Sequence, residues 1–265
     1  MAVTIAVIGG TGVYDPEILS DLREEQLSTP YGQVQLKIGS YQGREVAFMT
    51  RHGADHSVPP HLVNYRANIA ALRQLGVKSI FATAAVGSLN MDFAPRHFVL
   101  VDQFLDFTKG RPSTFVEQGV VHLDMTEPYC PELRQVLLRA ARELELPCHP
   151  AGTYVCTEGP RFETPAEIKM FKMLGGDLVG MTSVPEVVLA REAEICYATV
   201  AMVTNYAAGI SSSKLSHQEV VEIMTDNGAN LRRLLMRAIS LLPPERDCAC
   251  HHALAEPVAV PEKNN

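Results

Sequence analysis

The chain lacks the features of a membrane or secreted protein. Its 265 residues contain no run of about 18 apolar residues, so no transmembrane helix is predicted. The N-terminus has no basic stretch, and Gly9 and Gly10 interrupt its apolar run too early for a signal peptide. Basic residues are also in deficit, because 23 Lys and Arg stand against 30 Asp and Glu, for a net charge of −7. That charge argues against nucleic acid or an anionic membrane as a partner. Cysteines in reduced, apolar contexts lead us to expect a cytoplasmic protein.

Several catalytic motifs are missing as well. There is no G-x-S-x-G elbow, which disfavours a Ser-His-Asp hydrolase. There is no H-E-x-x-H and no paired C-x-x-C, so no catalytic metal is expected. The loop Gly9-Gly-Thr-Gly12 lacks the G-x-G-x-x-G spacing, and no acidic residue ends a second strand about 20 residues later, so a dinucleotide site is disfavoured. Backbone N–H groups and the Thr11 hydroxyl in this loop favour a phosphate cradle instead.

Cysteine is present but gives no disulfide pattern. Four of the six cysteines occur in apolar or strand-like stretches, where a reduced thiol packs as a small hydrophobic side chain. These are Cys130, Cys148, Cys156 and Cys196. The other two, Cys248 and Cys250, stand in a Cys-Ala-Cys-His-His segment that could bind a metal or form a disulfide, although a dispensable tail is the preferred interpretation.

Strand and helix patterns alternate along the chain. Apolar runs predict strands over residues 3–8, 34–38, 46–50, 79–83, 98–101, 149–156, 177–180 and 195–204, the second and third as a hairpin. Helices are predicted after Pro60 to Leu75, over residues 131–144, 166–174 and 184–193, and after a cap at Ser216. The pattern indicates one α/β domain, residues 1–242, with a mixed, largely parallel central sheet flanked by helices. Periodicity is lost after residue 243, so residues 243–265 are predicted to be a mobile tail.

Residues 158–167 combine a helix start with two side chains suited to a ligand. Thr164 can cap the helix, Pro165 suits its first position, and Glu167 completes a capping box. Phe162 and Glu163 are thereby left on the preceding loop. An aromatic face beside a lone carboxylate is what a planar heterocycle with an N–H requires.

Polar residues also follow predicted strands, where sheets of this kind bind ligands. Arg51 and His52 could donate to phosphate, or they could form a basic surface turn. The small residues 83–87 would let a ligand approach the backbone, or they could simply pack. Thr182 could donate a hydroxyl to phosphate. Asn205 ends the most hydrophobic strand, where its amide could bind a purine edge or cap the following turn.

Six segments, taken in chain order, resemble the trimeric class of purine nucleoside phosphorylases and the related methylthioadenosine phosphorylases. The resemblance runs over residues 5–241, and each segment alone is weak, whereas the ordered set is specific. The segments are Gly9-Gly-Thr-Gly12, Arg51-His-Gly53, Ala84-Ala-Val-Gly-Ser88, Glu158-Gly-Pro-Arg-Phe-Glu163, Met181-Thr-Ser-Val-Pro-Glu-Val187 and Thr204-Asn205.

The resemblance implies roles for particular residues. Those implied for phosphate are Thr11, Arg51, His52, Ala84 (through its N–H), Ala85 and Thr182. Those implied for the nucleoside are Phe162, Glu163, Met181, Asn205, Tyr206, Ala207, His217 and His122. Asn205 and His52 are the implied catalytic residues. The family completes its site with a residue from a neighbouring subunit, for which His122 is the first candidate and Phe115 the second.

Three positions separate the branches of this family. The adenine-directed branch has aspartate where this chain has Asn205 and serine where it has Glu163, and methylthio-specific relatives have an apolar residue where it has His217. A carboxylate at 163 accepts from N1–H of a 6-oxopurine. Facing adenine N1 it would oppose another acceptor, a mismatch on the order of several kcal/mol. The resemblance therefore implies inosine and guanosine as substrates.

The expected reaction is reversible phosphorolysis of these nucleosides to the free base and ribose 1-phosphate, in purine salvage. Inorganic phosphate is the co-substrate, no metal or organic cofactor is expected, and a homotrimer or homohexamer is implied. Three alternatives stay open. The first is a methylthioinosine or methylthioadenosine phosphorylase, the second a silent nucleoside-binding protein, and the third a Rossmann-type oxidoreductase.

Overall fold

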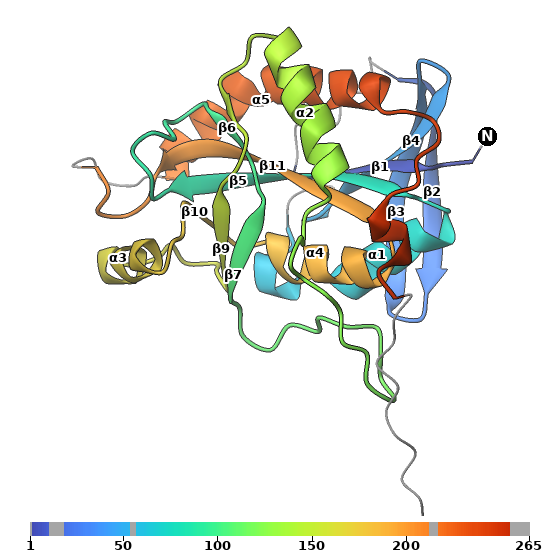
Figure 1. The fold of residues 1–265 in the computed structure, drawn as a ribbon, viewed down its shortest axis with the longest axis horizontal. Coiled ribbons are helices and arrows are strands. Elements are labelled where there is room, and N and C mark those ends of the chain that lie inside the picture. Colours follow the sequence, from blue (N-terminus) through green and yellow to red (C-terminus); the bar gives the residue numbers. More distant parts are fainter. Residues whose placement is uncertain (1, 11–18, 54–56, 212–216, 255–265) are drawn as a thin grey trace, which may run out of the picture.

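The computed structural model describes residues 2–10, 19–53, 57–211 and 217–254, with only the main chain for 217–220. One sheet of eleven strands forms the centre, with helices on both faces (Figure 1). The predicted single α/β unit with a mixed sheet is confirmed. Among the helices that the structure describes, none is long and apolar enough to cross a bilayer.

The main path of the sheet contains eight strands. In spatial order they are β2 (Ser20–Thr29), β3 (Gly32–Tyr41), β4 (Arg44–Thr50), β1 (Ile5–Gly9), β5 (Ser79–Ser88), β10 (Leu178–Gly180), β9 (Thr153–Thr157) and β7 (Gln103–Phe107).

The other three strands extend the sheet from the second edge of β5. They are β11 (Cys196–Tyr206), β6 (Phe98–Leu100) and β8 (Cys148–His149). β11 pairs in parallel with β5 along the whole of β5, and all but its last residue are buried. The prediction of a central strand buried on both faces is confirmed, because helices cover both sides of it.

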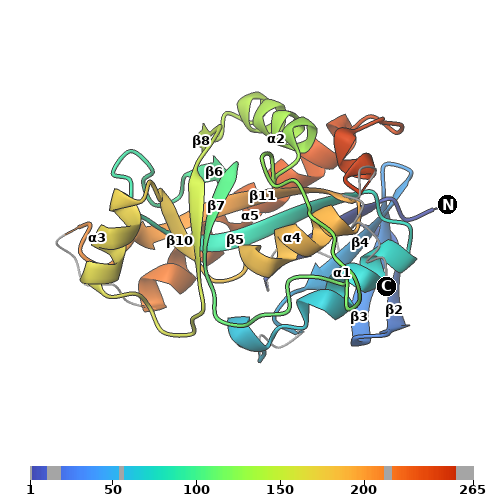
Figure 2. The ribbon, with the colours of Figure 1, turned by 60° about the horizontal axis from the view of Figure 1, so that its bottom comes forward.

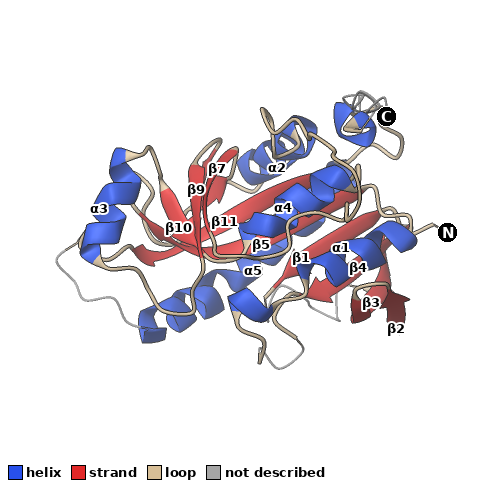
Figure 3. Ribbon diagram, turned by 90° about the horizontal axis from the view of Figure 1, so that it is seen from below, coloured by secondary structure: helices blue, strands red, loops and turns tan. Residues whose placement is uncertain are grey.

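Two pairs of helices cover the two faces of the sheet. In Figure 1, α2 (Pro131–Glu143) and α5 (His217–Leu241) lie above it, and α1 (Tyr65–Gln74) and α4 (Ser183–Glu192) lie below. Side chains along β1 alternate between the two faces of the sheet. Ile5 and Val7 belong to the core under α2 and α5, while Ala6 and Ile8 belong to the core on the face of α1 and α4. Figure 3 shows the same layers from below.

α3 (Pro165–Met173) lies at one end of the sheet (Figure 2) and forms a smaller third core there. Its Ile168 and Phe171 pack against Val155 of β9 and Val179 of β10. The predicted capping box is confirmed, since the Thr164 Oγ1 accepts from the Glu167 backbone N–H at 3.2 Å. α3 therefore has a fixed start, and the loop before it has a fixed end.

Some boundaries differ from the sequence prediction. The hairpin of β3 and β4 is confirmed, but the helix predicted after Pro60 begins at Tyr65, behind a 3-10 turn, η2 (Pro60–Leu62). Asn64 caps it by accepting from the Ala67 N–H at 3.1 Å, which ends the earlier turn. β2 was not predicted, because this mostly exposed edge strand is polar and shows no apolar alternation.

The segment after α5 folds back onto the core. It ends in a 3-10 helix, η3 (Ala249–His252), and Cys248 and Cys250 are each 3% exposed within the core under α2 and α5. Residues 243–254, which the sequence assigns to a tail, thus pack on the domain. Residues 255–265 lie outside the described residues.

Candidate active site

The centre of the sheet contains a gap between two strand ends. β1 pairs with β5 only as far as Ala82, and β10 pairs with β5 only from Gly87. β1 runs parallel to β5 and β10 antiparallel, so the two strands end facing each other along one edge of β5. Residues 83–86 form the edge between them. Loops leaving strand ends converge here, as at the ligand sites of other open α/β sheets.

Arg51 lies at the β1 end of this gap. It directly follows β4, and its backbone N–H donates to the Gly9 carbonyl at 2.9 Å. The guanidinium donates two hydrogen bonds of 2.7 Å to the Glu186 carboxylate, one from Nε and one from Nη2. Its Nη1 donates to the Thr83 carbonyl at 2.9 Å, on the open edge of β5. These bonds fix the plane of the guanidinium beside the gap.

The ion pair of Arg51 and Glu186 is buried from solvent, with side chains 3% and 0% exposed. The Tyr197 hydroxyl also donates to Glu186, at 2.7 Å. Burial by itself would lower the pKa of Arg51, but the charge and hydrogen bonds of Glu186 raise it above its usual range. Arg51 is therefore a permanent, oriented cation, and its N–H groups outside these bonds remain available to an anion.

His52 follows Arg51 on the same turn. Its Nδ1 lies 2.8 Å from the Val58 carbonyl oxygen, and the Val58 N–H donates back to the His52 carbonyl at 3.0 Å. Because a carbonyl only accepts, Nδ1 carries a proton. This contact orients the ring.

Ala84 and Ala85 lie on the open edge of β5 but differ in orientation. The Thr83 carbonyl points to Arg51, and backbone groups alternate between the two edges of a strand, so the Ala85 N–H faces the gap and the Ala84 N–H faces β11. Ala85 is exposed, whereas Ala84 is 9% exposed.

Thr182 enters the gap from the β10 side. It is buried, and its backbone N–H donates to the Tyr154 hydroxyl at 3.3 Å. The Thr182 side chain makes no capping bond to α4, although it occupies the N-cap position.

Glu163 and Phe162 lie on the loop between β9 and α3. Phe162 is 45% exposed, so its ring is open to a ligand or a partner surface. Glu163 accepts from the Thr157 hydroxyl at 2.7 Å, which turns its carboxylate toward the ends of β9 and β10. Burial raises the pKa of Glu163, while the Thr157 hydrogen bond lowers it in part. A desolvated carboxylate of this kind gains from a neutral N–H donor.

Arg111 ties together the loops on this side of the gap, and the sequence prediction missed it. Its Nη1 donates to the carbonyls of Met181 and Val184 at 2.8 and 2.9 Å, and its Nη2 to those of Thr157 and Glu158 at 3.2 and 2.8 Å. Its Nε also contacts the Glu158 carboxylate at 3.1 Å. One buried side chain thereby sets the relative position of the two ligand loops.

Met181 and Gly159 touch where these loops meet. A Cβ on Gly159 would lie 2.5 Å from the Met181 sulfur, and Gly159 also has a φ of +65°. The left-handed φ favours glycine at this position. The Met181 side chain packs directly against the Gly159 backbone.

Asn205 lies near the end of β11, at a shift in its register with β5. A register irregularity re-aims side chains, and here the Asn205 amide lies over Gly87, whose added Cβ would be 3.3 Å from Nδ2. Thr204 Oγ1 donates to Asn205 Oδ1 at 2.8 Å, and Nδ2 donates to the Tyr206 carbonyl at 2.9 Å. The amide keeps a second N–H and a second lone pair for a ligand.

The remaining predicted residues divide into three groups. Tyr206 and Ala207 follow Asn205 on the same turn, and the Tyr206 hydroxyl donates to Met91 O at 3.2 Å. His122 is exposed on the long loop before α2. Thr11 and the His217 side chain lie outside the described residues.

Comparison with known proteins identifies the family. The model of the phosphorylase superfamily matches residues 4–240. The chain belongs to this superfamily, whose members are enzymes, as the fold and the strand-end site indicate.

Two relatives and one solved structure illustrate the similarity. The chain is 61% identical over 249 residues, 93% of this chain and 96% of the relative, to a protein of Moorella thermoacetica named "Probable 6-oxopurine nucleoside phosphorylase". It is 56% identical over 258 residues, 94% and 97% of the two chains, to the 6-oxopurine nucleoside phosphorylase of Pyrococcus furiosus. The crystal structure of a methylthioadenosine phosphorylase from an Antarctic soil metagenomic library superposes with a TM-score of 0.92, at 39% identity over 98% of this chain and 94% of that one.

Proposed function

We propose that this chain catalyses the reversible phosphorolysis of 6-oxopurine ribonucleosides, inosine and guanosine, to the free base and ribose 1-phosphate. The observation that carries the proposal is the gap along β5. An anchored cation, Arg51, lies at one end, and two groups suited to a purine, Glu163 and Asn205, lie toward the other. A phosphate and a base held at opposite ends would leave the sugar between them.

The phosphate would occupy the Arg51 end of the gap. Arg51 supplies the fixed charge, Thr182 a hydroxyl, and the open edge of β5 a backbone N–H. On this edge the Ala85 N–H is better oriented than that of Ala84. His52 and Thr11 would complete the set by the family resemblance. Held here, the phosphate places negative charge beneath C1′ as the sugar develops oxocarbenium character.

The purine would lie against Phe162, with its edge toward Asn205 and Glu163. As the bond from C1′ to the base lengthens, negative charge grows on N7 and O6 of the purine. The spare N–H of Asn205 can donate to that charge, and this bond strengthens in the transition state. Asn205 is therefore the proposed catalytic residue for the departing base. Met181 would lie against the ribose.

Glu163 would select the base. Its carboxylate accepts from N1–H of hypoxanthine or guanine, whereas adenine offers an unprotonated N1 there. The raised pKa of Glu163 follows from burial, so excluding water around it increases the cost of a mismatched acceptor.

The proposal also covers the cellular role of the enzyme, its compartment and its oligomeric state. We expect the enzyme to act in purine salvage in the cytoplasm, as a homotrimer or a hexamer built from two trimers. His122 is exposed on a loop that could reach a neighbouring subunit, where it would complete the nucleoside site. His217 would face the 5′ hydroxyl of the sugar.

The test is base release from inosine, guanosine, adenosine, methylthioinosine and methylthioadenosine, each with and without inorganic phosphate. Phosphate-dependent release of hypoxanthine and guanine, with little adenine, is expected. Preferential cleavage of a methylthio nucleoside would favour the second candidate function, a methylthio-nucleoside phosphorylase. The structural relative with a TM-score of 0.92 is named as a methylthioadenosine phosphorylase. Binding of inosine without turnover would indicate a silent binding protein.

A further inference from the structure

Four buried cysteines meet at the end of the sheet opposite the gap. The four Sγ atoms lie within 4.8 Å of one another. They come from three separate parts of the chain, because one precedes α2, one begins β11 and two flank the start of η3. This cysteine cluster consists of Cys130, Cys196, Cys248 and Cys250.

The spacing of the sulfur atoms fits a tetrahedral metal site. Zinc bound by four thiolates has Zn–S distances near 2.3 Å, so its sulfur atoms stand about 3.8 Å apart. The Sγ atoms of Cys130 and Cys248 are 3.7 Å apart. A disulfide would require about 2.05 Å, and the structure has all four thiols unpaired.

Positive and N–H-donating groups surround the cluster. Arg191 Nη1 lies 3.3 Å from the Cys250 sulfur, and His251 Nε2 lies 3.4 Å from that of Cys196. Arg246 also interacts with Cys196. A divalent ion with four thiolates carries a net charge of −2, and these groups would offset that charge in a buried site.

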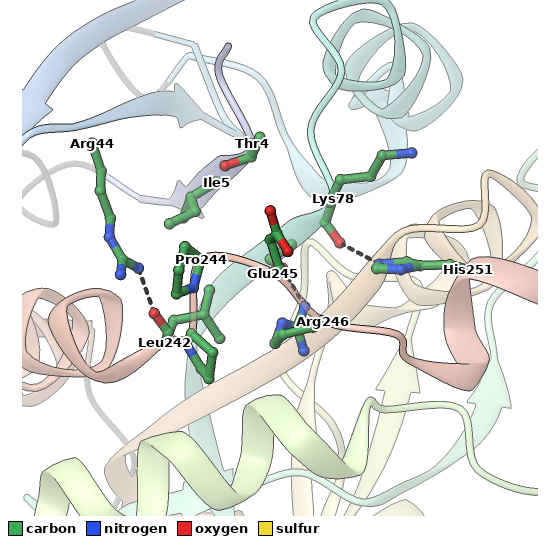
Figure 4. A pocket seen from close by; sticks show the side chains of 11 residues that line it. Thr4, Ile5, Arg44, Lys78, Leu242, Pro244, Glu245, Arg246 and His251 are labelled. Carbon is green, nitrogen blue, oxygen red and sulfur yellow. Dashed lines mark hydrogen bonds between the residues drawn. The ribbon is translucent and has the colours of Figure 1, made fainter. Parts of the chain in front are cut away.

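A cavity of about 320 Å³ lies beside His251, one of the side chains that contact the cluster. Figure 4 shows its lining, which includes Arg246, His251 and Lys78. His251 Nε2 lies 3.4 Å from the Lys78 carbonyl oxygen as well as from the Cys196 sulfur. His251 therefore separates the cavity from the Cys196 sulfur.

We propose that the cysteine cluster is a structural zinc site, with one Zn²⁺ bound by the thiolates of Cys130, Cys196, Cys248 and Cys250. Binding would release the thiol protons to solvent and leave the sulfur oxidation state unchanged. The ion would fasten residues 243–254 to α2 and β11. The expected role is structural, since four protein ligands leave no open coordination position.

The cluster is remote from the Asn205 end of the proposed active site, although Tyr197, which follows Cys196, donates to Glu186 beside Arg51. Cys196 begins β11 and Asn205 lies nine residues along it, so the two ends are about 30 Å apart at a rise of about 3.3 Å per residue. Loss of zinc should therefore act on stability before it acts on chemistry.

The first test counts metal in the full-length enzyme. Protein purified without chelators from zinc-supplemented cells is dialysed, and zinc and iron are measured by plasma mass spectrometry. About one zinc per chain is expected, with an intact mass after acid denaturation that matches six reduced cysteines. A metal-free chain, with free thiols or with disulfides that each lower the mass by two hydrogens, would overturn the proposal. Iron in place of zinc would overturn the choice of metal.

The second test compares variants. Cys248→Ser/Cys250→Ser should lose the zinc and melt on the order of 10 °C lower. Cys148→Ser, at a half-buried cysteine outside the cluster, should keep both zinc content and melting temperature. If the double variant does not fold, the wild-type enzyme is stripped with a strong chelator. Its melting temperature should fall and recover with Zn²⁺ but not with Mg²⁺, and no change on stripping would contradict the site.

Discussion

β11 has a different kind of site at each of its two ends. At its C-terminal end Asn205 lies over Gly87 at one end of the gap, and at its N-terminal end Cys196 joins the cysteine cluster. The first site has a cation, a carboxylate and an amide at an open edge of the sheet. The second has four thiols enclosed by helices and the C-terminal segment. One strand thus supports chemistry at one end and, by our proposal, a structural ion at the other.

The two sites differ in solvent access and in what each can still bind. Asn205 and Arg51 keep N–H groups outside their protein bonds, so a ligand can complete them. The cysteine cluster has its four ligands already assembled from the protein, so it needs only an ion. Variants at Asn205 should therefore change activity, whereas variants at the cysteine cluster should change stability. Glu186→Ala is an exception, because it lies at the active site and is expected to change stability.

The largest effect is expected at the active-site end, on stability. Glu186→Ala would leave the Arg51 charge buried without its partner, which costs about 3–5 kcal/mol in the free energy of unfolding. Urea unfolding measures this. Asp226→Ala, which breaks the exposed pair with Arg96, is the control and should cost about 0–1 kcal/mol. Equal losses in the two variants would mean that the buried pair does not hold the site together.

The next effect is on turnover alone. Asn205→Ala should lower kcat for inosine about 10²- to 10³-fold with a smaller change in KM, because its hydrogen bond strengthens as the base departs. Asn227→Ala removes another buried amide, bonded to the Arg96 carbonyl, and should cost stability but not kcat. Zinc content should be unchanged in both. Near-normal kcat in the first variant would contradict the role of Asn205.

A smaller effect is expected on base choice. Glu163→Gln should lower kcat/KM for inosine about 10- to 100-fold and that for adenosine by less, since an amide can donate to adenine N1. Glu167→Gln is the control, because glutamine preserves a capping box. The ratio of the two substrates should stay constant in that control, and a constant ratio in both variants would remove Glu163 from base selection.

The smallest effect is a shift of pH dependence. The ionised form of Glu163 binds N1–H, so kcat/KM for inosine should rise with pH through its raised pKa and fall below it. Thr157→Val removes a donor to the carboxylate, so the pKa rises further and the acid limb moves up by about 1 pH unit. Thr153→Val, on the same strand, should leave the limb in place. If the acid limb of the kcat/KM profile does not move in Thr157→Val, the limb reports the titration of a group other than Glu163.

Features that depend on neighbouring residues in the chain could be predicted from the sequence. Arg51, Thr182 and Asn205 each follow or end an apolar run, so their placement at strand ends could be predicted from periodicity. The capping box at Thr164 placed the loop that carries Glu163. The structure is consistent with these positions, while the roles of the residues stay predictions.

The long-range part could not be predicted. Glu186 lies 135 residues from Arg51, and Arg111 joins loops that only the fold brings together. The cysteine cluster as a whole was missed for the same reason. The sequence left metal binding open for Cys248 and Cys250 alone, and Cys130, just before α2, and Cys196, at the start of β11, are far from them along the chain. Each of the cysteines preceding α2 and beginning β11 reads locally as a small buried hydrophobic residue.

The most direct measurement of the central claim is the release of hypoxanthine from inosine, followed with and without inorganic phosphate, in wild type and Asn205→Ala. The account predicts release that requires phosphate, yields ribose 1-phosphate in equal amount, and falls at least 100-fold in kcat in the variant. Release that proceeds equally without phosphate, or that survives in the variant, would contradict it.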